Sequence, residues 1–281
     1  MSVTRRTFLG TAAAAATTMA IASAQSKKTP IGLELYSVRS ALTADPAGTV
    51  KKVAAMGYQV VEFFSPYYSW TMDQAKDMRK LLDDLGIKCH STHNNMPSFL
   101  PANLQKTIDL NHTIGGTFVV MASSNVNTAN PDDWKKLALE TLAPAIDKFR
   151  AAGLRGGYHN HQAEFRSSNG GPRPIEVIAA NTPKDFMLQF DVGTCVEVGG
   201  DPVAWVNANP GRINSLHLKD WNKERGYKVL FGEGSVPWKA VLTAAEKTGG
   251  AEYFLIEQEG SDYSEFETAQ RCLDTYRKMA T

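Results

Sequence analysis

The feature that most constrains the fold is a regular alternation of short apolar segments with longer helical ones. Eight short stretches rich in β-branched, aromatic and other apolar residues recur along the chain, at residues 31–36, 58–64, 87–93, 117–122, 155–161, 186–191, 213–218 and 253–259. Between them lie segments with the periodicity of amphipathic helices, such as residues 46–57, 72–86 and 131–153. Strands that alternate with helices predict a parallel sheet built from right-handed crossovers.

The number of these units selects one architecture. Several helical segments end in a glycine at the place of a helix C-cap, namely Gly57, Gly86, Gly153 and Gly249. Eight units in about 250 residues match a (β/α)₈ TIM barrel, whereas a doubly wound open sheet has fewer strands. No Gly-x-Gly-x-x-Gly follows the first strand, which argues against a dinucleotide-binding fold. We predict a single α/β domain, a TIM barrel spanning residues 26–281.

The first residues differ from the rest of the chain. Arg5 and Arg6 precede an alanine-rich, weakly apolar stretch that ends in the small residues 22–24. This pattern is typical of an export signal, and the Arg-Arg-x-Phe-Leu core resembles the twin-arginine type. We therefore predict that residues 1–25 are a signal peptide and that the mature protein is periplasmic, without stable membrane association after export.

Charge and cysteine content narrow the class of partner. The chain has 30 Lys and Arg residues against 29 Asp and Glu, without a long run of one sign, so a nucleic-acid partner is not supported. A small molecule is the better expectation. The three cysteines, Cys89, Cys195 and Cys272, are far apart, which favours isolated thiols, although one bridge is possible in an oxidising compartment.

Polar residues concentrate where the predicted strands end. In a TIM barrel these ends meet at one mouth, which is where active sites lie. Carboxylates and imidazoles gathered there repel one another or lose hydration unless a divalent cation, which uses the same O and N donors, compensates them. A histidine that is alone at a strand end is more often structural, but five of the six histidines fall at these ends. The residues are Glu62, His90, His93, His159, His161, Asp191, His217, Lys219, Asp220, Glu257 and Glu259.

The blocks "GLELYSVR", "YHNHQAEF", "FDVGT", "SLHLKD" and "LIEQE" resemble, in this order, those of the xylose isomerase-like barrels, also called sugar phosphate isomerase/epimerases. The resemblance implies one divalent metal ion (Mn, Mg, Zn or Co), held after strands five to eight. Asp191, His217 and Glu257 match three of the family's ligands directly. The family's glutamate after strand five is replaced by His159, so the fourth ligand is either His159 or Glu164 reaching back from the loop. His161 and Glu164 are then candidates for proton transfer.

The chemistry expected of this constellation is proton abstraction next to a carbonyl. A cation can chelate a sugar carbonyl and a neighbouring hydroxyl, while a flanking base removes the carbon-bound proton. If the proton returns, the enzyme is a sugar isomerase or epimerase; if a β-substituent leaves, it is a lyase or dehydratase, for example of 3-keto-glycosides. Because sugar phosphates are scarce outside the cytoplasm, export favours a free sugar or sugar derivative as the carbohydrate substrate.

Other residues at the mouth are candidates for substrate binding. His93, Glu62 and Lys219 offer hydrogen bonds to hydroxyl groups, and Trp221 offers a stacking surface for a sugar ring, although aromatic residues there also serve as loop anchors.

Two other classes of protein share such a barrel. A DNA-cleaving AP endonuclease requires more ligands, for a multi-metal cluster, and a basic surface that faces DNA. The nearly neutral charge of this chain does not indicate such a surface. A non-catalytic periplasmic sugar-binding barrel does not require a metal cage, so three retained ligand residues argue for an enzyme. The oligomeric state stays open.

Overall fold

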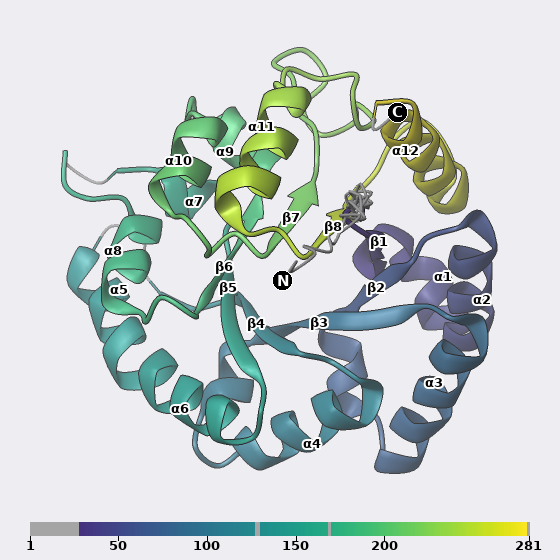
Figure 1. Cartoon of the computed structure of the whole chain (residues 1–281), viewed down its shortest axis with the longest axis horizontal. Helices are drawn as coiled ribbons and strands as arrows, with labels where there is room; N and C mark the ends of the chain where they lie inside the picture. Colours follow the sequence, from purple (N-terminus) through teal and green to yellow (C-terminus); the bar gives the residue numbers. More distant parts are fainter. Residues whose placement is uncertain (1–27, 127–129, 168–169, 280–281) are drawn as a thin grey trace, which may run out of the picture.

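The chain folds into a closed barrel of eight parallel strands surrounded by helices (Figure 1). This computed structural model describes residues 28–126, 130–167 and 170–279. Each strand pairs with the next in sequence, and β8 pairs with β1. The predicted TIM barrel is confirmed, and the predicted signal peptide lies outside the described residues. The strands are β1 (Ile31–Glu34), β2 (Val60–Phe63), β3 (Lys88–Asn95), β4 (Phe118–Ser123), β5 (Arg155–His159), β6 (Met187–Asp191), β7 (Ser215–Leu218) and β8 (Tyr253–Ile256).

The helices form the outer ring (Figure 1). Their ends follow local rules: Thr71 and Gln74 form a capping box at the start of α3, and Gly86, with φ +66°, ends that helix. The α-helices are α1 (Arg39–Ala44), α2 (Pro46–Met56), α3 (Met72–Leu85), α4 (Leu104–Ile114), α5 (Pro131–Lys136), α6 (Ala143–Ala151), α7 (Gln162–Phe165), α8 (Pro174–Asn181), α9 (Val192–Glu197), α10 (Pro202–Ala208), α11 (Trp238–Ala244) and α12 (Glu265–Met279). Short 3₁₀ segments are η1 (Leu35–Val38), η2 (Ser65–Ser69) and η3 (Met96–Phe99), and π-helical ones are η4 (Leu137–Leu142) and η5 (Ala245–Gly249).

The barrel interior has an apolar layer beneath a polar one. Six buried side chains form an inner cluster of their own, and all six come from even-numbered strands: Val60, Phe118, Val120, Met187, Tyr253 and Leu255. Alternate strands supply alternate layers of a TIM-barrel core. Because successive residues of a strand point to opposite faces, the residue two positions further along points inward one level higher. That rule puts Glu62 above Val60, Gln189 above Met187 and Glu257 above Leu255.

The odd-numbered strands carry small residues at the apolar level. A Cβ atom on Gly32 would lie only 2.6 Å from the carbonyl oxygen of Val60, so glycine is required there by close packing. Two residues after Gly32 comes Glu34, and two residues after Gly157 comes His159, and both side chains are buried. The small residues thus leave room for the inner cluster, while the alternation along each strand directs Glu34 and His159 inward above it.

Some details correct the sequence-based expectations. The left-handed residue that ends η5 is Gly250 (φ +78°), one position after the predicted Gly249, because the π-helical turn adds a residue. The three cysteines are free, as expected, and all three are buried. Within the described ranges, no helix combines the length and apolar character needed to cross a bilayer.

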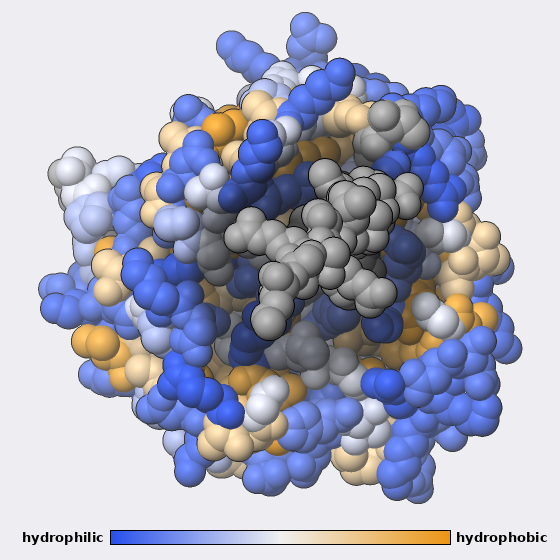
Figure 2. Space-filling model, in the orientation of Figure 1, coloured by the Kyte–Doolittle hydropathy of each residue, from blue (hydrophilic) through white to orange (hydrophobic). Residues whose placement is uncertain are grey.

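Figure 2 shows hydrophilic residues over much of the helical rim, with hydrophobic residues in small groups between them.

Candidate metal centre

Seven polar residues are brought to the carboxyl ends of the strands and buried there. Strand pairing aligns them: Glu34 is opposite Glu62, His159 opposite Gln189, and Asp191 opposite His217. The side chains are buried almost completely, so each charge must be balanced within the site. The residues are Glu34, Glu62, His159, Gln189, Asp191, His217 and Glu257.

Three of the four predicted metal ligands form a compact group of donors. His159, Asp191 and Glu257 each offer one ligand atom, and these atoms all lie within 4.8 Å of one another. The oxygen Oδ1 of Asp191 accepts a hydrogen bond from the backbone N–H of Thr194 (3.0 Å), whereas Oδ2 is buried and has no hydrogen-bond partner among the described residues. Burial keeps the pKa of His159 well below its usual value, helped by the neighbouring His217, so its ring is neutral and able to coordinate a cation.

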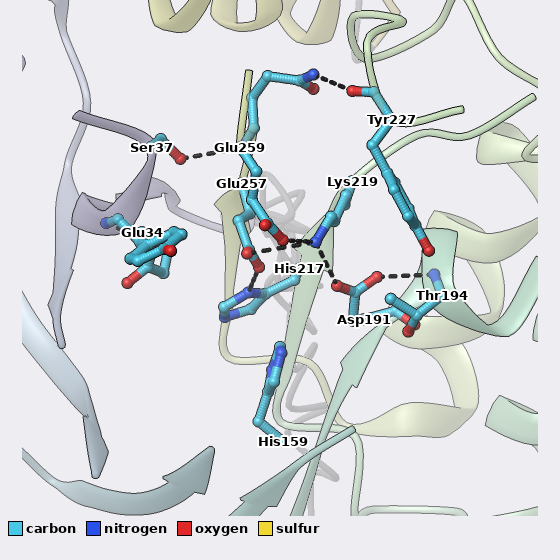
Figure 3. A network of polar contacts seen from close by, with 12 residues as sticks. Glu34, Ser37, His159, Asp191, Thr194, His217, Lys219, Tyr227, Glu257 and Glu259 are labelled. Atoms are coloured by element: carbon cyan, nitrogen blue, oxygen red, sulfur yellow. Dashed lines mark hydrogen bonds and ion pairs between the residues drawn. The ribbon is translucent and has the colours of Figure 1, made fainter. Parts of the chain in front are cut away.

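The fourth predicted ligand, His217, lies between two carboxylates. Its Nδ1 atom is 2.5 Å from Oε2 of Glu257, and its Nε2 atom is 2.8 Å from Oε2 of Glu62. Burial is the largest single influence on the pKa of His217 and lowers it, but the two glutamates outweigh burial and raise the pKa to about 10. The carboxylate of Glu62 orients the ring in the manner typical of histidines that bind metals. Figure 3 shows His217 beside Glu257, with the ring of His159 pointing toward it.

Gln189 connects the histidines and was missed from the sequence. Its Oε1 atom lies 2.6 Å from Nε2 of His93 and 3.1 Å from Nδ1 of His159, and its amide nitrogen donates to Glu62 (2.8 Å). Its place in the site could have been predicted from the sequence, because Gln189 lies two residues before Asp191 and therefore on the same face of the strand. Of the predicted substrate-binding residues, His93 and Glu62 are therefore joined to the centre, with His93 Nε2 3.0 Å from Glu62 Oε2.

Lys219 provides a buried positive charge at the centre. Its Nζ atom lies 3.6 Å from Oδ2 of Asp191 and 3.5 Å from Oε1 of Glu257, and it donates a hydrogen bond to Glu259 (Figure 3). Burial is the largest influence on the pKa of the ammonium and opposes its charge, yet the carboxylates, led by Glu257, raise the pKa well above the usual value. Lys219 is thus a fixed cation beside the donors of the candidate metal site.

The remaining predicted residues lie less centrally. Both oxygens of Glu164 are engaged elsewhere: Oε1 accepts from the Tyr158 hydroxyl (2.9 Å) and Oε2 from the backbone N–H of His161 (2.8 Å), which caps α7. Glu164 belongs to none of the donor groups that could share an ion in the described ranges. The ring of His161 is 5.0 Å from that of His159, and this residue is exposed. Trp221 is half-buried, and its backbone N–H donates to Asp220.

Asp220 is a structural anchor. Its fully buried carboxylate accepts hydrogen bonds from four backbone N–H groups and from the indole of Trp238 (2.8 Å). The donors other than Trp238 belong to Trp221, Gly232, Gly234 and Val236. Asp220 therefore holds the whole segment between β7 and α11, including the Gly-Glu-Gly turn, against the barrel mouth.

The donor set suits a divalent metal ion. Carboxylate oxygens and imidazole nitrogens are common ligands of Mn²⁺, Zn²⁺ and related ions. Oδ2 of Asp191 is buried, accepts no hydrogen bond from the described residues and has the Lys219 ammonium, 3.6 Å away, to balance its charge. His159, Asp191, His217 and Glu257 are the residues that would hold such an ion.

Comparison with known proteins identifies the family. The sequence profile of the xylose isomerase-like TIM barrel matches residues 50–278, most of the chain. The chain belongs to the xylose isomerase-like TIM barrel family. The predicted resemblance is therefore confirmed. The proteins that share this barrel include sugar isomerases, epimerases and dehydratases.

Proteins that are similar to this chain differ in their named activities. A sugar phosphate isomerase/epimerase structure from Parabacteroides distasonis is 25% identical, with a TM-score of 0.76 over 90% of this chain and 94% of that one. An inosose dehydratase from Clostridium perfringens is 21% identical over 61% of this chain and 63% of its own length, so less than two thirds of that relative is matched. The structure of the IOLI protein with a bound zinc atom is 15% identical, with a TM-score of 0.67 over 89% of this chain and 98% of that one.

Proposed function

We propose that this protein is a divalent-metal-dependent isomerase or epimerase of a free sugar or sugar derivative. The observation that carries the proposal is the convergence of His159, Asp191 and Glu257, whose donor atoms lie within 4.8 Å of one another at the mouth of a sugar-isomerase barrel. A bound divalent cation would supply Lewis acidity to a substrate carbonyl and the adjacent hydroxyl.

The protein's own residues would orient the substrate and move the proton. Lys219 is charged and buried, so it offers a strong hydrogen bond to a substrate oxygen on which negative charge develops. His161 is exposed and next to His159, where it can accept a proton from a carbon beside the carbonyl. Glu62 and Gln189 keep the rings of His217 and His159 in position.

Deuterium exchange tests this proposal. The metal-loaded protein is incubated with free ketoses and 3-keto-glycosides in deuterated water, and the products are followed by mass spectrometry and NMR. Deuterium next to the carbonyl in an intact carbon skeleton supports isomerase or epimerase chemistry. The absence of exchange with every substrate, together with the absence of metal binding, would overturn the proposal and favour a barrel that only binds sugar.

A dehydratase is the second candidate, for two reasons. The Clostridium relative is named an inosose dehydratase. In addition, the ammonium of Lys219 lies close to the carboxylates, where a hydrogen bond from it would stabilise the negative charge that develops on a departing hydroxyl or glycosidic oxygen. In the deuterium experiment, loss of water or release of the aglycone distinguishes this reaction from epimerisation.

We also propose that residues 1–25 direct export to the periplasm, as their twin-arginine pattern predicts. Cell fractionation tests this proposal. The unaltered chain should accumulate in the periplasm, whereas replacement of both Arg5 and Arg6 by Lys should retain it in the cytoplasm. Equal distribution of the two chains would contradict an export role for the arginine pair.

A further inference from the structure

A second group of donors lies beside the candidate metal centre, on the first three strands. Glu34 ends β1, Glu62 lies on β2 and His93 on β3, and one ligand atom from each lies within 4.8 Å of the others. Within the group, His93 Nε2 is 3.0 Å from Glu62 Oε2, a spacing that two ligands of one metal ion commonly have. None of these three residues belongs to the set of His159, Asp191 and Glu257.

Glu34 supplies an independent observation. Its oxygen Oε2 accepts a hydrogen bond from the backbone N–H of Tyr36 (2.6 Å), which holds the carboxyl group in place. Its other oxygen, Oε1, is buried and has no hydrogen-bond partner within the described ranges, and the side chain is completely inaccessible. A buried carboxylate oxygen without a partner is costly unless a cation or another group compensates it. No role in the proposed reaction accounts for its presence at this level of the barrel.

The neighbouring hydrogen bonds leave Glu62 able to bind a cation as well. Its Oε1 atom accepts from the amide of Gln189, and Oε2 faces the ring nitrogens of His217 and His93. The nitrogen of His93 in turn faces two acceptor oxygens, those of Glu62 and Gln189. Acceptors that converge in this way surround either a proton or a metal ion.

We propose that Glu34, Glu62 and His93 bind a second divalent cation, adjacent to the first. Two carboxylates and one imidazole suit Mn²⁺, Zn²⁺ or Fe²⁺ rather than Ca²⁺ or Mg²⁺, which prefer all-oxygen sites. The inference rests on these residues and not on the proposed reaction. Glu62 connects the two sites, since it contacts His93 of the second and His217 of the first.

The test is the stoichiometry of bound manganese. The mature protein and its variants are loaded with Mn²⁺ and dialysed, and metal per chain is measured by elemental mass spectrometry. We expect two ions in the unaltered protein and one in Glu34→Gln, in His93→Gln and in Asp191→Asn, which removes the first site. Glu34→Gln combined with Asp191→Asn should bind none. Glu252→Gln, a matched change at a partly exposed carboxylate paired with Arg155, should still bind two.

The outcomes separate this inference from the proposed function. One ion in the unaltered protein that is lost in Asp191→Asn and kept in both Glu34→Gln and His93→Gln would overturn the second site and leave the first. One ion that is kept in Asp191→Asn and lost in Glu34→Gln would establish the second site and overturn the first. Circular dichroism melting of each variant shows whether a loss of metal reflects a loss of fold, and the two variants at the second site provide independent measurements.

Discussion

The ammonium nitrogen of Lys219 lies 3.6 Å from Oδ2 of Asp191, the oxygen that has no hydrogen-bond partner among the described residues. The same nitrogen lies 3.5 Å from Glu257. Lys219 therefore stabilises two of the carboxylates that a metal ion would bind. A metal cation bound there would be repelled by the positive charge of the Lys219 ammonium, because charges of the same sign repel strongly in a buried site. The lysine and the metal ion thus compete for the same negative charge.

Replacing Lys219 by Met should increase the response to metal. Without the ammonium, the buried carboxylates are unpaired, so the metal-free variant should melt at a lower temperature than the unaltered protein. Mn²⁺ should then bind at least about tenfold more tightly and produce a larger rise in melting temperature. Isothermal titration calorimetry and melting curves measure both effects. The exposed Lys223→Met provides the control, and weaker Mn²⁺ binding in K219M would show that Lys219 assists the metal instead.

Asp220→Asn should destabilise the protein strongly. The carboxylate accepts from four backbone N–H groups and one indole, whereas an asparagine turns an N–H₂ group toward some of these donors. We expect a loss of about 3 kcal/mol or more in the free energy of unfolding, measured by urea denaturation. Asp262→Asn, which breaks an exposed ion pair with Arg225, should change it by less than about 1 kcal/mol. Equal effects would contradict the anchoring role.

The metal-free protein should lose stability as the pH rises. The pKa of His217 is raised to about 10 from its ordinary value of 6.5, because Glu62 and Glu257 outweigh the effect of burial. A raised folded-state pKa gives a contribution that is complete below the unfolded pKa and is lost as the pH rises through the folded one. Urea midpoints in the presence of a chelator should therefore fall between pH 6.5 and about 10. In His217→Gln this decline should be smaller; an identical decline would assign it to other groups.

Glu164→Gln should affect stability more than chemistry. The carboxylate caps α7 and accepts from Tyr158, so its replacement should cost about 1 kcal/mol of unfolding free energy. The number of bound metal ions should not change. If instead Glu164→Gln abolished deuterium exchange without lowering stability, Glu164 would be the catalytic base, and the position of its side chain would differ in the working enzyme.

The barrel could be predicted from the sequence because its signals are local and repeated. Each of the eight apolar segments overlaps an observed strand, since β-branched runs and glycine-ended helices act over short distances. Asp191, His217 and Glu257 could be found in the same way, because strand ends converge in every TIM barrel.

What could not be predicted depends on contacts between distant strands. Glu34 and Gln189 become part of the centre only when β1 and β6 close into one barrel with β2 and β3. Glu164 is near His159 in sequence, but the turn into α7 directs its carboxylate to Tyr158. The positive charge of Lys219 beside Asp191 likewise arises from the pairing of neighbouring strands and their ends, which spacing alone does not report.

The most direct test of the metal centre is an anomalous diffraction map of crystals soaked with Mn²⁺. We expect an anomalous peak bounded by His159, Asp191 and Glu257, with His217 turned toward it by Glu62. The absence of a peak at this position, with Lys219 still paired to Asp191 at saturating Mn²⁺, would contradict a metal-dependent function.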